Sequence, residues 1–578
     1  MSTVSAPPTT AGTCGKRPLD YVRTLMRLER RSVWLVVIFS VAIGLLTLAT
    51  PVAVQTLVNF VAFGGLTQPL IVLGILLLVF LSTQAVIRCL NSYVAELLQR
   101  RVFARAVAEL GDRLPRVNRE AYDSGFGAGS VNKFFDVLTV QKVGSKLLLD
   151  AIGVLLQTSI GLIVLAFYHP YLLAFDLVVV LAIAVILFPL GRGAVRTALR
   201  ESTAKYAVAD ALEDVANQPV AFQQVDSNDF ALRRADHLAS EYLDARRSHF
   251  RIVFRQIAGA FALQALAGTA LLTIGGLLVI KNQLTLGQLV AAELIVALVL
   301  DSFSKFGRKL ESVYDLVAAS HKIGLLMDTP REREDGHALE SRTEPASLRL
   351  HDVRYAYEGG HESIGPVSTD VAPGSITAIE GRRGSGKSTL AELLYGQRDP
   401  GNGHIEVDGQ DLRSLSLASM RSQVCLVQPG QLLRGTVEQN VQFGRPEVDP
   451  PAVRRALELV GVMDDVRRLP KGVSTPLIPI GRPLSSGSVD LVLLARAIAG
   501  QPRLLILDDI CDDLDHESRE RVLKALGEMR DKTTTVILTR GGWDDPNLDR
   551  RVRIGKQFDQ GFGDADSASE DDSERRAG

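Results

Sequence analysis

Long apolar runs separated by charged stretches occupy the first 300 positions of this 578-residue chain. Residues 32–87 contain no Asp, Glu, Lys or Arg. This run is too long for one transmembrane helix, which needs about 20 apolar residues, and it fits two with a break at residues 64–69. Residues 151–191 and 256–300 are also long enough for two spans each. The pattern therefore predicts six transmembrane helices.

The charged stretches between the spans predict long helices outside the membrane. Residues 88–146 and 192–255 are nearly free of helix breakers, and residues 97–114 and 204–216 have helical spacing. Basic residues beside a span favour the cytoplasmic side. Six of them precede the first span: Lys16, Arg17, Arg23, Arg27, Arg30 and Arg31. We therefore expect a cytoplasmic N-terminus and, after six crossings, a cytoplasmic C-terminal region.

A phosphate-binding sequence lies about 80 residues beyond the last apolar run. Residues 381–389 read Gly-Arg-Arg-Gly-Ser-Gly-Lys-Ser-Thr, a complete G-x-x-x-x-G-K-[ST] loop. Residues 375–380 predict a preceding strand, and residues 390–394 a following helix whose N-terminal dipole faces an anion. Glycines let backbone N–H groups surround the phosphates, and the Ser388 hydroxyl is placed to hold Mg²⁺. The residues expected to bind the nucleotide are Gly381, Gly384, Ser385, Gly386, Lys387, Ser388 and Thr389.

Membrane helices that extend into the cytoplasm and precede a phosphate-loop domain resemble the ATP-binding cassette (ABC) exporters of the half-transporter type. Five further motifs, in the family's order, carry this resemblance over nearly the whole chain. They are Tyr357 in Arg-Tyr-Ala-Tyr, Gln428 in Val-Gln-Pro, Leu484-Ser485-Ser486-Gly487-Ser488, residues 504–509 reading Leu-Leu-Ile-Leu-Asp-Asp, and Leu514-Asp515. The resemblance implies an α-helical six-span membrane domain fused to an α/β P-loop nucleotide-binding domain.

The resemblance also implies a role for each motif. Tyr357 is expected to stack on the adenine of ATP. The residues expected to hold Mg²⁺ are Ser388, Gln428 and Asp508. The residues expected to take part in hydrolysis are Asp509, Arg540 and Gln428. The residues expected to meet the nucleotide of an opposing subunit are Ser485, Gly487 and Asp515. An ATP site of this family therefore needs a second half-transporter.

Three motifs depart from the family pattern, at four positions. The glutamate that usually polarises the attacking water is Asp509, whose carboxylate is one methylene shorter. Arg540 replaces the histidine that the family usually has at this position. Its guanidinium is always charged, so it is unable to act as a neutral hydrogen-bond relay. The segment 484–488 corresponds to the signature motif of the family. In this segment, Ser486 and Ser488 replace a glycine and a glutamine. General-base catalysis tolerates misplacement poorly, so these changes predict attenuated hydrolysis.

Two interpretations of these departures remain open. In the first, Asp509 and Arg540 mark a slow ATP site and form an ion pair with each other at rest. In the second, they are a competent variant set, because an aspartate can still act as a base and an arginine can still stabilise transition-state charge.

Acidic residues inside the spans are a functional hypothesis by default. Glu293 and Asp301 lie eight positions apart on the sixth predicted span, close to one helix face. They either line a polar translocation cavity or pair with neighbouring basic residues. Asp176 lies close to the outer end of its span and is expected to be an interface residue.

Composition and charge delimit the domains. The predicted divisions are a cytosolic segment 1–32, a transmembrane domain 33–327, a linker 328–347, an ATP-binding cassette domain 348–558 and an acidic disordered tail 559–578. The four cysteines have no paired spacing, so they indicate neither a disulfide framework nor a zinc site. No platform of aromatic and basic residues indicates nucleic-acid binding.

These observations predict an ATPase coupled to transport, with ATP and Mg²⁺ as cofactors. The chain is expected to export a protein, peptide, lipid or other amphiphile across the bacterial cytoplasmic membrane as a dimer of half-transporters. A homodimer is favoured slightly over a heterodimer, and a secretion adaptor is a further candidate partner. The alternative is an ATP-binding, weakly hydrolysing regulatory or gating subunit of a membrane complex.

Overall fold

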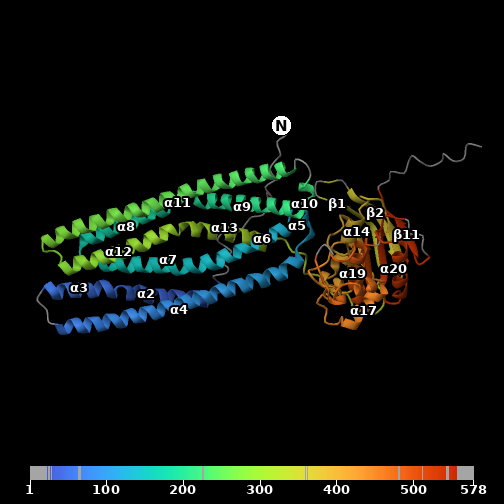
Figure 1. Cartoon of the computed structure of the whole chain (residues 1–578), viewed down its shortest axis with the longest axis horizontal. Coiled ribbons are helices and arrows are strands. Elements are labelled where there is room, and N and C mark those ends of the chain that lie inside the picture. The colour runs from blue at the N-terminus through green and yellow to red at the C-terminus, as the bar shows by residue number, and fades with distance from the viewer. Residues whose placement is uncertain are drawn as a thin grey trace, which may run out of the picture. The chain divides into compact units, whose positions relative to one another are not determined.

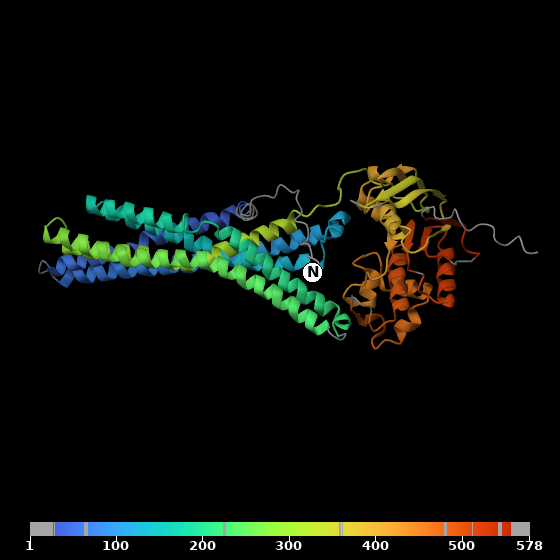
Figure 2. The same cartoon turned by 90° about the horizontal axis from the view of Figure 1, so that it is seen from above.

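The computed structural model of the chain contains two compact units (Figures 1 and 2). One unit comprises Met1–Val117 and Ala121–Pro330, and the other comprises Asn118–Glu120 and Arg331–Gly578. The residues that the structure describes are 23, 27, 29–62, 67–223, 227–357, 360, 362–478, 482–510, 512–541 and 546–555. The predicted acidic tail, 559–578, lies outside them.

The first unit is a bundle of long helices that lie side by side in both views (Figures 1 and 2). From residue 30 to residue 327, the helices are α2 (Arg30–Thr47), α3 (Ala49–Ala62), α4 (Thr67–Arg113), η1 (Leu114–Arg116), α5 (Arg119–Asp123), α6 (Ala128–Asn132), η2 (Lys133–Phe135), α7 (Asp136–Ala166), α8 (Pro170–Leu187), α9 (Ala194–Asn217), α10 (Pro219–Phe222), α11 (Ser227–Ile280), α12 (Leu286–Arg308) and α13 (Leu310–Met327).

Six helices among the described residues are long and apolar enough to cross a membrane, which confirms the predicted number of spans. Their apolar side chains are extensively exposed on the protein surface. Ile71 and Leu78 of α4 are 63% and 66% exposed, and Leu177 of α8 is 70% exposed. Apolar surface on this scale is stable only against another apolar phase, and the hydrocarbon of a bilayer supplies one.

Two of the spanning helices continue far beyond the length that a membrane requires. Helix α4 has 47 residues and α11 has 54, which confirms the predicted long extensions. The polar stretch 88–146 is nevertheless not one continuous helix. Pro115 stands in the short helix η1 directly after α4, and Gly125 adopts a positive φ of 99° soon afterwards. Both residues interrupt α-helical hydrogen bonding, so the chain turns before α7 begins.

The acidic residues inside the spans differ in their surroundings. Asp301 pairs with Lys305 at 2.6 Å, as the pairing alternative expects. Asp176 is buried among the helices, with 4% of its surface exposed, and its expected position at the membrane interface stays a prediction. Neither carboxylate oxygen of Asp176 has a hydrogen-bond partner among the residues that the structure describes, and the same holds for Oε2 of Glu293.

The second unit contains two larger β-sheets, a two-stranded pair and the helices that cover them. Its strands are β1 (Leu348–Ala356), β2 (Glu362–Val371), β3 (Ile376–Glu380), β4 (Asn402–Val407), β5 (Gln410–Asp411), β6 (Val424–Val427), β7 (Gly435–Thr436), β8 (Pro476–Leu477), β9 (Leu504–Asp508), β10 (Thr534–Thr539) and β11 (Arg550–Arg553). Its helices are α14 (Lys387–Leu394), η3 (Leu412–Ser414), α15 (Leu417–Arg421), α16 (Val437–Gln442), α17 (Pro450–Leu459), α18 (Met463–Arg467), η4 (Gly472–Ser474), α19 (Ser486–Ala499) and α20 (His516–Glu528).

The central sheet of this unit is parallel, with the strand order β11-β3-β10-β9-β6. A second sheet, of order β2-β1-β4-β5, is antiparallel. Every residue of β3, β9 and β10 is buried, because helices and the second sheet cover both faces. Alternate residues of β9 enter different hydrophobic clusters: Leu505 and Leu507 lie in one, and Leu504 and Ile506 in the other.

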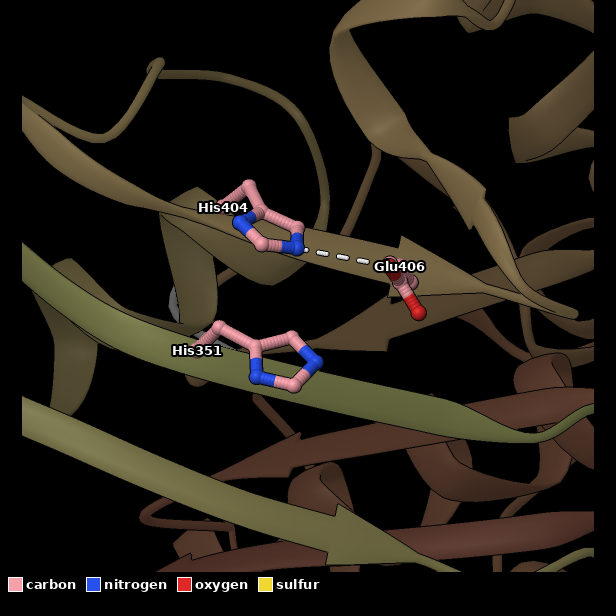
Figure 3. A group of neighbouring side chains, drawn as sticks. All are labelled: His351, His404 and Glu406. Carbon is pink, nitrogen blue, oxygen red and sulfur yellow. Dashed lines mark hydrogen bonds and ion pairs between the residues drawn. The ribbon is translucent and has the colours of Figure 1, made fainter.

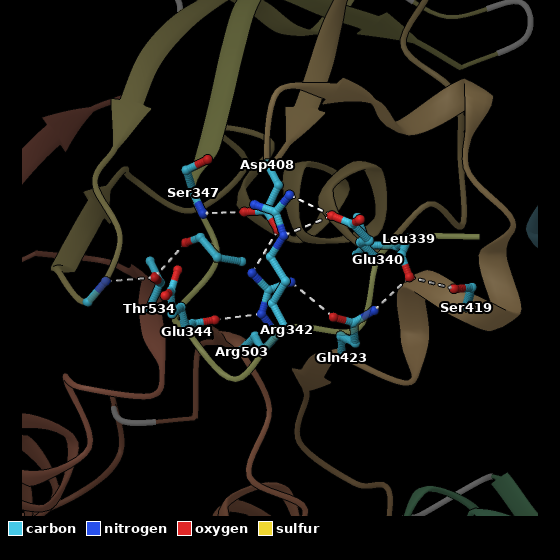
Figure 4. A network of polar contacts seen from close by, with 12 residues as sticks. Leu339, Glu340, Arg342, Glu344, Ser347, Asp408, Ser419, Gln423, Arg503 and Thr534 are labelled. Carbon is cyan, nitrogen blue, oxygen red and sulfur yellow. Dashed lines mark hydrogen bonds and ion pairs between the residues drawn. The ribbon is translucent and has the colours of Figure 1, made fainter. Parts of the chain in front are cut away.

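A buried arginine fixes the end of the predicted linker to this unit (Figure 4). Arg503 donates to the carbonyl of Glu344 at 2.5 Å and to Oε1 of Gln423 at 2.9 Å, and it pairs with Asp408 at 2.7 Å. Asp408 in turn accepts the backbone N–H of Ser347 at 2.9 Å. All of these donors are satisfied in a site where only 5% of Arg503 is exposed. The arginine, which directly precedes β9, therefore joins the linker to the residue before β6 and the residue after β4.

We predict that Arg503→Ala destabilises the second unit by about 3–5 kcal/mol, because it leaves the buried carboxylate of Asp408 without its charged partner. Differential scanning calorimetry of the full chain measures this as a lower unfolding temperature. Arg342→Ala is the matched control, because Arg342 is exposed and contacts Glu340 (Figure 4). Equal unfolding temperatures for the two variants would show that the network contributes nothing.

Candidate functional site

The parallel register of the central sheet determines where the candidate site forms. Glu380, the last residue of β3, pairs with Thr539, the last residue of β10, and Asp508 at the end of β9 pairs with Leu538. The carboxyl ends of these strands therefore meet at one edge of the sheet. In open α/β sheets this edge is where ligands bind.

The phosphate loop leaves β3 at this edge and enters α14. The predicted strand and helix are both confirmed, although the helix begins at Lys387, three residues earlier than expected. Gly384 and Gly386 have φ values of 81° and 90°, which L-residues with a side chain rarely adopt. A Cβ atom at Gly386 would also lie 2.7 Å from the carbonyl oxygen of Ser363. Only glycine fits this close approach of the loop to β2.

The loop borders a cavity of about 380 Å³ that is lined mainly by polar and cationic groups. Its lining residues are Ser363, Arg383, Gly384, Gly386, Lys387, Ser388, Thr389, Asp509 and Arg540. Lys387 is buried and donates to the carbonyl of Gly381 at 3.0 Å. The Ser385 hydroxyl is buried without a hydrogen-bond partner among the described residues. The cationic side chains, the unpaired hydroxyl and the N-terminus of α14 fit a polyphosphate.

Asp508 gathers two of the predicted metal-binding side chains. Its Oδ1 accepts the Ser388 hydroxyl at 3.2 Å, and its Oδ2 accepts Nε2 of Gln428 at 3.1 Å. Burial raises the pKa of Asp508, and these two hydrogen bonds oppose that shift. A carboxylate, a hydroxyl and an amide oxygen form the all-oxygen donor set that Mg²⁺ prefers, so the residues present fit this ion.

The aromatic residue predicted to stack on adenine lies beside the same loop. The Tyr357 hydroxyl is 3.0 Å from the Thr389 hydroxyl, and 37% of the surface of Tyr357 is exposed. The guanidinium of Arg398 lies 4.8 Å from the centroid of this ring. Sequence reasoning did not identify Arg398, because no motif spacing relates it to Tyr357. A cation against one face of the ring leaves the rest of the ring for other contacts.

Residues 364–512 match the family model described as ABC transporter. The chain carries an ABC transporter domain.

Curated proteins and solved structures include many that are similar to the chain. The ATP-dependent lipid A-core flippase of Thiobacillus denitrificans is 31% identical over 53% of this chain and 52% of its own length. The fatty acid ABC transporter ATP-binding/permease protein of Mycobacterium bovis is 32% identical over 47% of this chain and 43% of its own length. The chain thus spans about half the length of the curated relatives it matches.

The structure of a bacterial Atm1-family ABC exporter with ATP bound aligns with a TM-score of 0.77. It covers 88% of this chain and 92% of the aligned chain, at 21% identity. This likeness shows the fold: the chain has the half-transporter fold of ABC exporters, with a helical membrane part and an α/β nucleotide-binding part.

The signature segment of the ABC transporter domain begins helix α19. Ser485 caps this helix, and its hydroxyl accepts the backbone N–H of Ser488 at 3.2 Å. The Ser488 hydroxyl donates to Asp465 at 2.7 Å. A Cβ atom at Gly487 would meet only Leu514, at 3.6 Å. The serine that replaces the usual glutamine is therefore held inside its own subunit.

The loop after β9 of the ABC transporter domain contains a third carboxylate that sequence reasoning missed. Asp512 accepts the backbone N–H of Arg540 at 3.0 Å and the hydroxyl of Thr539, and its Oδ2 lies 3.5 Å from Nε of Arg540. Only 6% of the Asp512 side chain is exposed. The run of four acidic residues between positions 508 and 513 was the available signal, but it did not indicate which carboxylate faces Arg540.

The expected ion pair between Asp509 and Arg540 is wrong, because each residue has another partner. Asp509 lies 3.9 Å from Nζ of Lys387, whereas Arg540 pairs with Asp512. Asp509 has a positive φ of 53°, which directs the chain away from β9. Burial raises the pKa of Asp509, Lys387 lowers it, and the nearby carboxylate of Asp508 raises it further.

Asp515 occupies the start of α20. Its carboxylate caps the helix by accepting the backbone N–H of Ser518 at 2.7 Å, and this hydrogen bond lowers the pKa of Asp515. Its contacts within its own subunit are therefore structural.

We predict that Asp512→Ala lowers the free energy of unfolding by about 1–3 kcal/mol, because it removes the acceptor of a buried hydroxyl and of a backbone N–H. Thermal unfolding of the full chain measures the change. Asp513→Ala is the matched control, since the neighbouring Asp513 is exposed. If both variants unfold at the wild-type temperature, Asp512 does not hold the Thr539–Arg540 segment.

Proposed function

We propose that the chain is one half of an ATP-driven exporter in the bacterial cytoplasmic membrane. The observation that carries this proposal is the convergence of the phosphate loop, Asp508 and Gln428 at one sheet edge, in a chain with six membrane-length helices. Binding and hydrolysis of ATP by such a domain would drive the conformational change of the membrane helices.

The roles proposed for the site residues follow from their chemistry. The backbone of the loop and Lys387 would bind the phosphates, and Ser388, Gln428 and Asp508 would hold Mg²⁺. Tyr357 would contact the adenine. Mg²⁺ supplies charge neutralisation of the phosphates when it is bound. Asp509 is the carboxylate proposed to orient the attacking water.

A second half-transporter is the proposed partner. Among the described residues, the lining of the cavity beside Lys387 does not include Ser485, Gly487 or Asp515 of the same chain. A second subunit would bring the same segments to this nucleotide, as in the ABC exporters that the fold resembles. Native mass spectrometry of the complex from its own membranes distinguishes a homodimer, which we favour slightly, from a heterodimer or an assembly with an adaptor.

Among the substrate classes expected from the sequence, we favour a lipid or another amphiphile. Two of the similar proteins have names that specify lipid A-core and fatty acid as substrates. A half-transporter with extensively apolar outer helices can admit such molecules from the bilayer.

A second candidate function is a regulatory subunit that binds ATP and hydrolyses little. The ion pair of Arg540 with Asp512 and the short Asp509 side chain favour it. The ion pair engages the Arg540 guanidinium, and the carboxylate of Asp509 reaches one methylene less far than the usual glutamate would.

We predict that Lys387→Ala lowers ATP binding at least tenfold while the chain still inserts into the membrane, because the lysine supplies a buried positive charge beside the loop. Binding of a fluorescent ATP analogue to the purified full chain measures the loss. Lys524→Ala is the control, since Lys524 is exposed on α20. Wild-type affinity in Lys387→Ala would disprove the site assignment.

We predict that the double change Asp509→Glu with Arg540→His raises the ATPase rate about tenfold, which corresponds to about 1.4 kcal/mol of transition-state stabilisation. The longer carboxylate reaches further toward the water, and histidine replaces a permanently charged guanidinium with a side chain that can be a neutral hydrogen-bond partner. Steady-state phosphate release measures the rate, with Asp513→Glu as the control.

The single variants separate the two contributions. If water positioning limits the rate, Asp509→Glu alone gives most of the gain. A slower Arg540→His enzyme would instead identify Arg540 as a phosphate clamp. A double variant no faster than the wild type would mean that the native set is competent, and attenuation would have to be abandoned.

A further inference from the structure

Two imidazoles and a carboxylate lie together on the antiparallel sheet (Figure 3). His351 belongs to β1, and His404 and Glu406 belong to β4. One ligand atom from each of the three side chains lies within 4.8 Å of the others. This cluster has no role in the proposed nucleotide site. We propose that this cluster binds a divalent transition-metal ion such as Zn²⁺.

The sheet register brings these residues together. His351 pairs directly with His404 across the β1–β4 ladder. His404 and Glu406 are two positions apart on β4, so their side chains project from the same face. The imidazole rings of His351 and His404 stack with centroids 4.6 Å apart. The backbone therefore fixes all three ligands on one face without a contribution from a loop.

The existing distances suit a tetrahedral ion. Nε2 of His404 lies 3.3 Å from Oε1 of Glu406. Two ligands that bind zinc at its usual bond lengths in a tetrahedron lie about 3.4 Å apart, so this edge already has the required length. The ligand atom of His351 lies within 4.8 Å of the other two and would have to move closer to complete the set. Two histidines and one carboxylate leave the fourth position for water, a donor set that is common for zinc.

A strand irregularity lies directly beside the cluster. The β1–β4 register shifts after His351, and the next residue, Asp352, has a positive φ of 43°. Bulges re-aim side chains and are frequent beside functional sites. An ion held by both strands would link them where their pairing is interrupted. Because β1 leads to Tyr357 six residues later, this link would also stabilise the strand that presents the aromatic ring.

One neighbouring cation opposes metal binding. Arg349 lies opposite Glu406 in the ladder, and its NH1 is 3.6 Å from Oε2 of that carboxylate. Its Nε also donates to Asp370 at 2.9 Å. Arg349 thus holds the outer oxygen of Glu406, while Oε1 faces His404. Removing Arg349 should raise the metal affinity, because like charges repel at this distance.

The test is zinc binding by the full chain, purified without a polyhistidine tag in lipid nanodiscs and treated with a chelator. Isothermal titration with Zn²⁺ should give one site per chain. His351→Ala and His404→Ala should each weaken binding at least tenfold, and Arg349→Ala should strengthen it. His516→Ala is the matched control, because His516 is also exposed and also pairs with a glutamate, Glu520.

Two further measurements keep the outcome clear. Binding of an ATP analogue by each variant in the metal-free state shows that its nucleotide-binding domain is folded. Zinc X-ray absorption of the loaded protein should show two imidazole ligands. The proposal is overturned if the wild type takes up no zinc at micromolar concentrations. It is also overturned if the double variant His351→Ala with His404→Ala binds zinc as tightly as the wild type, which would place the metal elsewhere.

Discussion

The parallel pairing of β3, β10, β9 and β6 is the constraint on which the candidate ATP site depends. These strands come from sequence positions between 376 and 539, and their shared direction brings their carboxyl ends to one edge. The phosphate loop, Gln428 and Arg540 each follow one of these strands, and Asp508 is the last residue of β9. The burial of both sheet faces keeps the register fixed, since a shift of one residue would move apolar side chains between the two hydrophobic clusters. The core and the site are therefore determined by the same pairing.

Much of this arrangement follows from local sequence patterns. The six spans can be predicted because a long run without charged residues, such as residues 32–87, is stable only in an apolar environment such as the bilayer. The phosphate loop can be predicted because its glycines and lysine are adjacent in the chain. What could not be predicted is which carboxylate approaches Arg540. That choice depends on the positive φ of Asp509, which turns the loop so that Asp512, three residues later, faces β10. No periodicity in the sequence encodes this turn.

The same reasoning explains why the cluster of His351, His404 and Glu406 was missed. His351 and His404 are 53 positions apart, and only the β1–β4 register places them opposite each other. Arg398 beside Tyr357 is a similar case. Contacts between distant strands require the fold, whereas motifs of adjacent residues do not.

The length of α4 and α11 has a mechanical consequence. At 1.5 Å per residue, helices of 47 and 54 residues are about 70 Å and 80 Å long, while the hydrocarbon core takes about 30 Å. More than half of each helix therefore lies beyond the lipid tails. A stiff rod of this length acts as a lever: tilting an 80 Å helix by about 5° at one end displaces the other by about 7 Å. A small rotation of the apolar segments would therefore produce a large displacement at the far ends of these helices.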